Sequence, residues 1–194
     1  MKLQSSLRFT ICIVIAVNCL RPSQLASQVH ASSDAHHPLA SPESEADRVH
    51  TDRTFEFTVK APLNVAGPLF GADRERAWAP GWDPAFVWPA KPKDQRGMVF
   101  VVVRGERTSV WITSAADPSS GYFQYAYVMP NVVATLITIQ LTPHGESTHA
   151  EVRYERTALN SSANEAVSKM AMNDSRSGPE WESQINGYLA LKRR

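Results

Sequence analysis

Residues 68–89 have the sequence PLFGADRERAWAPGWDPAFVWP, and the rest of the chain is organised around this stretch. It contains three of the five tryptophans, Trp78, Trp82 and Trp88. Its prolines and Gly81 interrupt any long helix or strand. We therefore predict a mostly irregular bridge that connects one early strand to a sheet and closes one end of a cavity.

One strand is predicted before this bridge, and two short helices are predicted at and within its first half. Thr54–Lys60 alternates between apolar and polar residues, with Phe55, Phe57 and Val59 on one face, which is typical of a half-buried antiparallel strand. Residues 62–70 then suit a short helix with a proline in its first turn. Residues 73–78 suit one further helical turn.

The segment after the bridge predicts a meander of antiparallel strands. Turn residues separate five β segments, at 97–103, 107–114, 122–129, 132–142 and 148–157. The last segment has one apolar and one polar face, which indicates a sheet with one covered side. Around Trp111 the pattern leaves two options open, because either Trp111 or its neighbours Val110 and Ile112 could point inward.

The C-terminal part changes to helical periodicity. Ser162–Glu165 has the pattern of a capping box, and apolar residues recur at helical spacing after it. Residues 174–178 interrupt the helix, and Pro179 suits a restart. We expect a long, interrupted C-terminal helix across the covered side of the sheet.

The first 31 residues have the features of a secretion signal. A positive start precedes an apolar run at 9–17, which is shorter than the roughly 20 residues that span a bilayer. Cleavage is expected after Ala31 or after Ser27, and an uncleaved signal-anchor is the alternative. The predicted location is periplasmic or secreted, without stable membrane insertion after cleavage.

Both cysteines, Cys12 and Cys19, fall in this signal, so the mature chain can form no disulfide. Residues 32–52 are small and polar and predict a disordered leader. Residues 53–191 then form one domain. The net charge of +1, without a clustered basic face, argues against a nucleic-acid partner.

An ordered set of residues resembles bacterial proteins of the START-like, or SRPBCC, superfamily. The set spans about residues 54–190 and comprises 68–89, Gly97–Phe100, Val110–Thr113, Tyr125, Glu155–Leu159, Trp181 and Tyr188–Leu189. The resemblance implies an α+β helix-grip fold, in which a curved antiparallel sheet wraps around a long C-terminal helix and leaves a cavity between them. It says more about the fold than about the function.

We find no residues that predict catalysis, a cofactor or a metal site. The mature chain has no cysteine and no Gly-x-Ser-x-Gly motif. His144 and His149 flank Glu146, but an exposed hairpin tip explains them better than a closed metal site. The acids of the alternating strands lie on polar faces, so a paired carboxylate inside the cavity is not expected.

Aromatic residues with a few polar tips remain as the predicted cavity lining. The predicted ligand contacts are Phe57, Trp111, Tyr125, Thr135, Tyr154, Met170, Trp181 and Tyr188. Trp78, Trp82 and Trp88 are predicted to gate the cavity, mainly by holding their segment in place.

The leading hypothesis is an exported protein that binds a small hydrophobic or lipid-like molecule. One alternative is an enzyme of the polyketide cyclase or dehydratase type, with Tyr125 or Tyr154 acting through a shifted pKa. The other alternative is a non-catalytic protein-interaction module, which would have a closed core.

Overall fold

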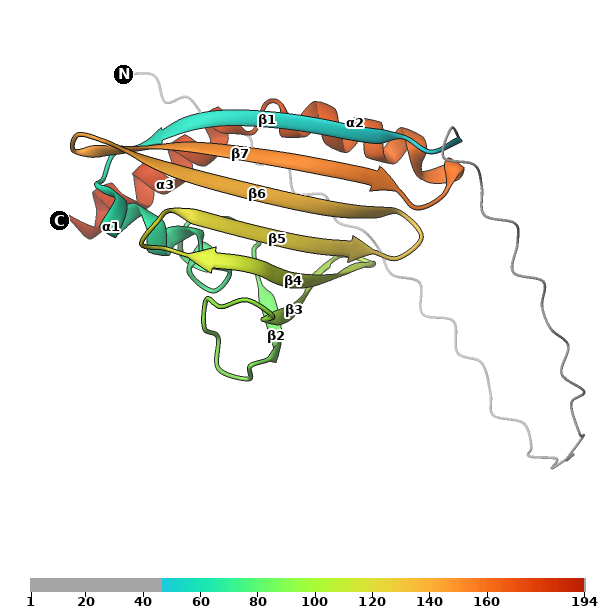
Figure 1. Cartoon of the computed structure of the whole chain (residues 1–194), viewed down its shortest axis with the longest axis horizontal. Coiled ribbons are helices and arrows are strands. Elements are labelled where there is room, and N and C mark those ends of the chain that lie inside the picture. The colour runs from blue at the N-terminus through green and yellow to red at the C-terminus, as the bar shows by residue number, and fades with distance from the viewer. Residues whose placement is uncertain (1–46, 194) are drawn as a thin grey trace, which may run out of the picture. The chain divides into compact units, whose positions relative to one another are not determined.

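Seven antiparallel strands form one sheet in the order β1-β7-β6-β5-β4-β3-β2 (Figure 1). The computed structural model describes residues 47–193, so the predicted signal peptide and most of the predicted leader lie outside the described residues. The strands are β1 (His50–Val59), β2 (Pro84–Trp88), β3 (Val99–Arg104), β4 (Arg107–Asp117), β5 (Tyr122–Met129), β6 (Val133–His144) and β7 (Ser147–Ala158).

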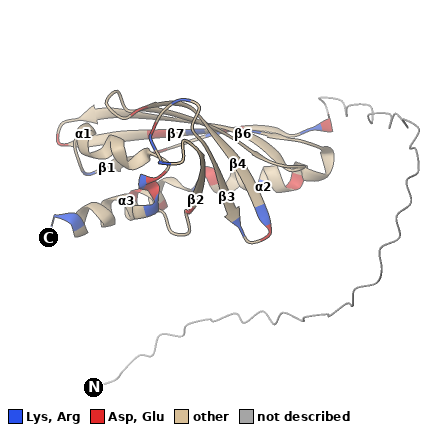
Figure 2. Ribbon diagram, turned by 90° about the horizontal axis from the view of Figure 1, so that it is seen from below, with Lys and Arg blue, Asp and Glu red and all other residues tan. Residues whose placement is uncertain are grey.

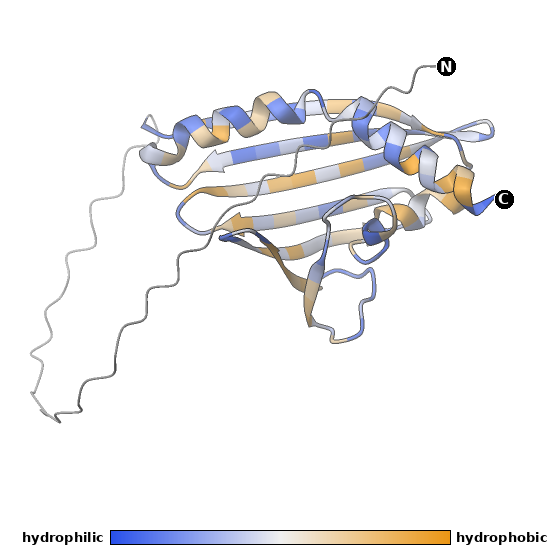
Figure 3. Ribbon diagram, turned by 180° about the vertical axis from the view of Figure 1, so that it is seen from behind, coloured by the Kyte–Doolittle hydropathy of each residue, from blue (hydrophilic) through white to orange (hydrophobic). Residues whose placement is uncertain are grey.

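Helices cover one face of this sheet. Figure 3 shows the two C-terminal helices in front of the strands, which confirms the expected α+β arrangement. Short helices follow β1, and a 3-10 turn precedes the C-terminal pair. The helical elements are α1 (Leu63–Ala66), η2 (Gly67–Phe70), η3 (Arg74–Ala77), η4 (Ser161–Ala163), α2 (Asn164–Asp174) and α3 (Gly178–Lys192).

The alternation of the strands separates an inner, buried face from an outer face. On the outer face Val110, Ile112 and Val128 are 41–47% exposed. Trp111 therefore points inward, which decides between the two options that the sequence left open. The buried residues of the inner face on β5 and β6 are Phe123, Tyr125, Tyr127, Val133, Thr135, Ile137, Ile139 and Leu141.

Strand β1 pairs with β7 along its whole length, from His50 opposite Thr157 to Val59 opposite Thr148. Phe55, Phe57 and Val59 are buried, as the alternation predicted. The strand begins at His50, and its first residues fall within the segment predicted as a leader.

Residues 84–88 form a strand that the sequence did not predict. β2 pairs with β3 at the edge of the sheet, with Phe86 opposite Phe100. The prediction of a mostly irregular bridge is therefore wrong for these residues. Prolines concealed the strand, because Pro84 is tolerated at the first position of an edge strand.

The predicted capping box at Ser162–Glu165 is wrong, because α2 has no side-chain cap. Instead the Asn160 side chain accepts a hydrogen bond from the Ala163 N–H, at 3.1 Å, and starts the chain on η4. The predicted interruption of the C-terminal helix is confirmed between Asp174 and Gly178. A Cβ at Gly178 would lie 2.7 Å from the Glu56 carbonyl oxygen, so glycine permits this close approach to β1.

A buried ion pair connects the end of α2 to the inner face of the sheet. Arg156 of β7 donates to Asp174 from Nε, at 2.6 Å, and from Nη2, at 2.8 Å. Its Nη1 donates to the Tyr127 hydroxyl and, at 3.1 Å, to the Thr135 hydroxyl. The guanidinium thus bonds to one helix and two neighbouring strands at once.

Replacing Asp174 with Asn should lower the free energy of unfolding by about 3 kcal/mol, because the substitution leaves a buried guanidinium without its counter-charge. Urea denaturation measures the change. Asp52→Asn is the matched control, since Asp52 pairs with Arg153 on an exposed surface and its loss should be hardly measurable. Equal, small effects of both substitutions would contradict a structural role for the buried pair.

Candidate functional site

A cavity of about 830 Å³ lies between the inner face of the sheet, η3, α2 and α3. Its volume falls within the range of small-molecule sites, about 300–1,000 Å³. Strands β3 to β7 all contribute side chains to its wall, so the cavity extends across most of the sheet.

Aromatic rings dominate the wall of this cavity. They come from the 68–89 segment, from four strands and from α3, and several contact one another. Trp111 stacks on Tyr127 with ring centroids 4.2 Å apart, and Trp82 meets Trp111 edge-on at 5.2 Å. The aromatic wall consists of Trp78, Trp82, Phe100, Trp111, Tyr125, Tyr127, Tyr154 and Trp181.

Hydrogen bonds hold the first two tryptophans of the wall in place. The indole N–H of Trp78 donates to the Leu69 carbonyl at 2.7 Å, and that of Trp82 donates to the Ala72 carbonyl at 2.6 Å. Both rings therefore fix the fold of their own segment and also face the cavity. Trp88, predicted with them, lies on the edge strand β2, is 53% exposed and does not line the cavity.

The structure brings five of the predicted ligand contacts together around the cavity, namely Trp111, Tyr125, Tyr154, Met170 and Trp181. Three others lie elsewhere. Phe57 packs in the core against Phe70 and Trp181. Thr135 accepts a hydrogen bond from Arg156, and Tyr188 lies beneath Lys192 on α3. As ligand contacts, all eight remain predictions.

Arg156 and Asp174 also line the cavity, and sequence reasoning missed both. The Arg156 guanidinium lies 4.5 Å from the centroid of the Tyr154 ring. Burial opposes its charge, but the hydrogen bonds to Asp174 and the charge of that carboxylate raise the pKa of Arg156 above its ordinary value. The residue is therefore a fixed cation, and each of its three nitrogens already donates to a protein group.

Glu75 of η3 is, with Asp174, one of the two buried acids that line the cavity. Neither was predicted from the sequence, where only acids of the alternating strands were considered. Glu75 is only 9% exposed. Within residues 47–193 no hydrogen bond to its carboxylate is found, although its backbone amide and carbonyl are bonded in the turn. Burial raises the pKa of Glu75 well above its ordinary value, repulsion from Asp94 raises it further, and Arg104 opposes the shift.

Sequence reasoning missed Glu75 because it searched for acids only in the alternating strands. The signal that could have found it is its spacing from Trp78, since residues three apart in a helical turn share a face. Because Trp78 lines the cavity, Glu75 on the same face lines it as well.

Charged residues of both signs surround the turn between β3 and β4, at one part of the cavity wall (Figure 2). Arg104, Glu106 and Arg107 are exposed there. On α3, Glu180 and Gln184 also line the cavity. Aromatic rings therefore dominate the buried part of the cavity wall, whereas the exposed part is polar or charged.

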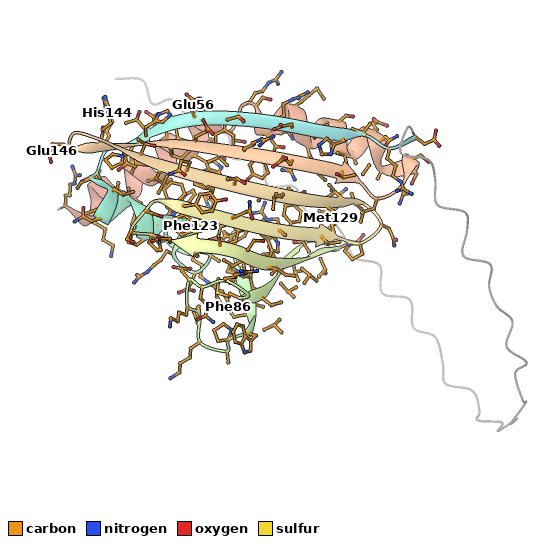
Figure 4. The ribbon with its side chains drawn as sticks, viewed as in Figure 1. Glu56, Phe86, Phe123, Met129, His144 and Glu146 are labelled. Carbon is orange, nitrogen blue, oxygen red and sulfur yellow. The ribbon has the colours of Figure 1, made fainter. Side chains whose placement is uncertain are left out.

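The histidines considered for a metal site lie away from the cavity. Figure 4 places His144 and Glu146 at the turn between β6 and β7, at the opposite end of the sheet from the cavity-lining Met129. Across residues 47–193 no cluster of three metal-ligating side chains occurs. Within the same residues, no helix combines the length and apolar character needed to cross a bilayer.

Comparison with known proteins gave matches to solved structures alone. No family model matches the sequence. No curated protein matches it either.

The solved structures that match include an enzyme, norcoclaurine synthase, in more than one crystal structure. Norcoclaurine synthase from Thalictrum flavum is 14% identical, with a TM-score of 0.56 over 87% of this chain and 100% of that chain. A second structure of that enzyme, in complex with dopamine and hydroxybenzaldehyde, is 16% identical, with a TM-score of 0.54 over 77% and 91%.

Ara h 8.0201 is 12% identical, with a TM-score of 0.52 over 74% of this chain and 99% of that chain. The Mll3558 protein of Rhizobium loti is 16% identical, with a TM-score of 0.51 over 73% and 98%. At these identities the likeness concerns the fold alone. Together with the curved antiparallel sheet and the C-terminal helices across it, it shows that the chain has a helix-grip fold.

Proposed function

We propose that the protein binds a small hydrophobic molecule in the cavity between the sheet and the C-terminal helices. The observation that carries this proposal is the wall of eight aromatic side chains around about 830 Å³. A ligand that removes about 200 Å² of apolar surface from water gains about 5 kcal/mol before the costs of association. The two small aromatic molecules in the norcoclaurine synthase complex support a site of this kind in this fold.

The cavity also weighs against a non-catalytic protein-interaction module, for which we expected a closed core. A space of about 830 Å³ separates the inner face of the sheet from the helices, so the core is not closed there.

A neutral fluorescent probe, N-phenylnaphthylamine, should bind the folded protein and raise its melting temperature. Trp111→Ala should weaken this binding about 10-fold, because the ring contributes apolar area and stacking within the cavity. Ile112→Ala is the matched control, since its side chain lies one residue away on the outer face and should leave the affinity unchanged. Equal effects of the two substitutions, or no binding by the unaltered protein, would refute the proposal.

Catalysis in the same cavity is a second candidate function, favoured by Glu75. Burial raises the pKa of both Tyr125 and Tyr154 away from neutrality, so neither tyrosine suits the role of a base. A buried carboxyl group with a raised pKa is, in contrast, suited to general acid or base chemistry.

If the protein is a dehydratase, incubation with aromatic β-hydroxyketones should yield products that have lost one water molecule. Mass spectrometry would detect them. A reaction that uses the deprotonated Glu75 should accelerate as pH rises through the raised pKa of this group and then level off. Substrates recovered unchanged at every pH would leave binding as the function that the cavity supports.

We further propose that the protein is exported. The support is the sequence of residues 1–31, with its positive start and short apolar run. Mass spectrometry of the protein from the expressing cell's extracytoplasmic fraction should find a mature chain that begins at Ser32 or at Gln28. A full-length chain confined to the cytoplasm would refute export without affecting the binding proposal.

A further inference from the structure

The least satisfied polar group of the cavity is the carboxylate of Glu75. Only 9% of the residue is exposed, and no hydrogen bond to its carboxylate occurs within residues 47–193. A buried carboxylate without a partner is costly, so it either takes up a proton or waits for a partner that binds. Because its side chain lines the cavity, such a partner can come from a ligand.

The other buried charges of the cavity are already neutralised by the protein. Asp174 accepts two hydrogen bonds from Arg156. Arg104 opposes the raised pKa of Glu75 electrostatically, but it is exposed at the end of β3 and forms no ion pair with Glu75 within the described residues. Among the buried carboxyl and guanidinium groups that line the cavity, Glu75 is therefore the one without a counter-charge from the described protein.

The surroundings of Glu75 suit a positive charge better than a negative one. The faces of aromatic rings carry partial negative charge and attract organic cations, most strongly where water is excluded. Eight such side chains line this cavity, among them Trp78, which belongs to the same turn as Glu75.

An anionic ligand finds no unpaired cation in the buried part of the wall, because the charge of Arg156 is matched by Asp174. All three nitrogens of the Arg156 guanidinium donate to protein oxygens, those of Asp174, Tyr127 and Thr135. The remaining arginines of the wall, Arg104 and Arg107, are exposed at the β3–β4 turn. The polar head of a fatty acid would thus meet Glu75 without a free guanidinium beside it.

We propose that the ligand is an arylalkyl amine, protonated at its nitrogen, or another organic cation, whose nitrogen binds at the Glu75 carboxylate while its apolar body packs against the aromatic wall. This inference rests on the proposed binding function and specifies the chemical class of its ligand.

The affinity for such a cation should depend on pH, because only the deprotonated form of Glu75 carries the complementary charge. The groups that act on Glu75 are Asp94, Arg104, Tyr125 and Tyr154, from the loop before β3 and from β3, β5 and β7. Since burial and Asp94 raise the pKa of Glu75, proton loss occurs at a higher pH than in water. Affinity should rise with pH up to that pKa and stay constant above it.

Two isosteric probes separate charge from shape. Naphthylmethyl trimethylammonium carries a permanent positive charge, and neopentylnaphthalene has the same shape with a carbon in place of the nitrogen. The unaltered protein should bind the ammonium probe at least ~10-fold more tightly than the neutral probe above the pKa of Glu75. Naphthylacetate, the anionic probe, should bind most weakly of the three.

Glu75→Gln should remove the preference for the ammonium probe and its pH dependence, and it should leave the affinity for the neutral probe within about 3-fold of the original. Glu151→Gln is the matched control, because it makes the same chemical change at an exposed position of β7 that does not line the cavity. It should retain the preference. A loss as large as that of Glu75→Gln would assign the effect to the overall field of the protein and would overturn the proposal.

The outcomes separate a failure of this inference from a failure of the proposed binding function on which it rests. If neither the ammonium nor the neutral probe binds, the binding function itself fails. If the neutral probe or naphthylacetate binds as well as the ammonium probe, the cavity binds ligands but the assignment of a cation is wrong. If Glu75→Gln does not fold, the unaltered protein still decides the question, since a ratio of ammonium to neutral affinity that does not change with pH overturns the proposal.

Discussion

The buried pair of Arg156 and Asp174 fixes the C-terminal end of α2 to the inner face of the sheet. Its two hydrogen bonds, at 2.6 and 2.8 Å, join the last residue of α2 to an inward-pointing residue of β7. A pair of this kind contributes little net stability relative to apolar packing, but it tolerates few alternative positions of its partners. Here it holds α2 where the helix forms one wall of the cavity, and the chain then breaks and restarts as α3.

Polar atoms of several aromatic residues around the cavity are likewise bonded to the protein, which leaves the wall largely apolar. The indole N–H groups of Trp78 and Trp82 bond to backbone carbonyls, and Tyr125 donates to the Phe70 carbonyl at 2.8 Å. These rings therefore present mainly their apolar faces to the interior. Glu75 differs from these residues, because its side chain has no hydrogen bond within the described residues.

The pattern of alternation and turn residues predicted much of the fold. It located β1 and the five strands of the meander, and it placed Phe55, Phe57 and Val59 on the buried face. It failed at β2, where prolines suggested irregular structure although an edge strand accepts them. The segment preceding β2 was correctly expected to contain short helices.

The candidate site was less predictable, because its polar groups are defined by contacts between distant elements. Arg156 follows Tyr154 by two residues and so shares its face, but a lone arginine in a strand gives no sign of burial. Its partner lies on a helix, 18 residues further along the chain. Phe57 was equally ambiguous, since an inward aromatic residue can face other core rings rather than the cavity.

The pairing of β1 with β7 has a consequence for the order in which the molecule is assembled. His50 and Thr157 lie opposite each other and are 107 positions apart in the sequence. During synthesis, the first strand must therefore wait for almost the whole domain before its partner exists. Loop-closure entropy makes such distant pairings slow. Until β7 is complete, β1 lacks the one strand beside which it lies in the finished sheet.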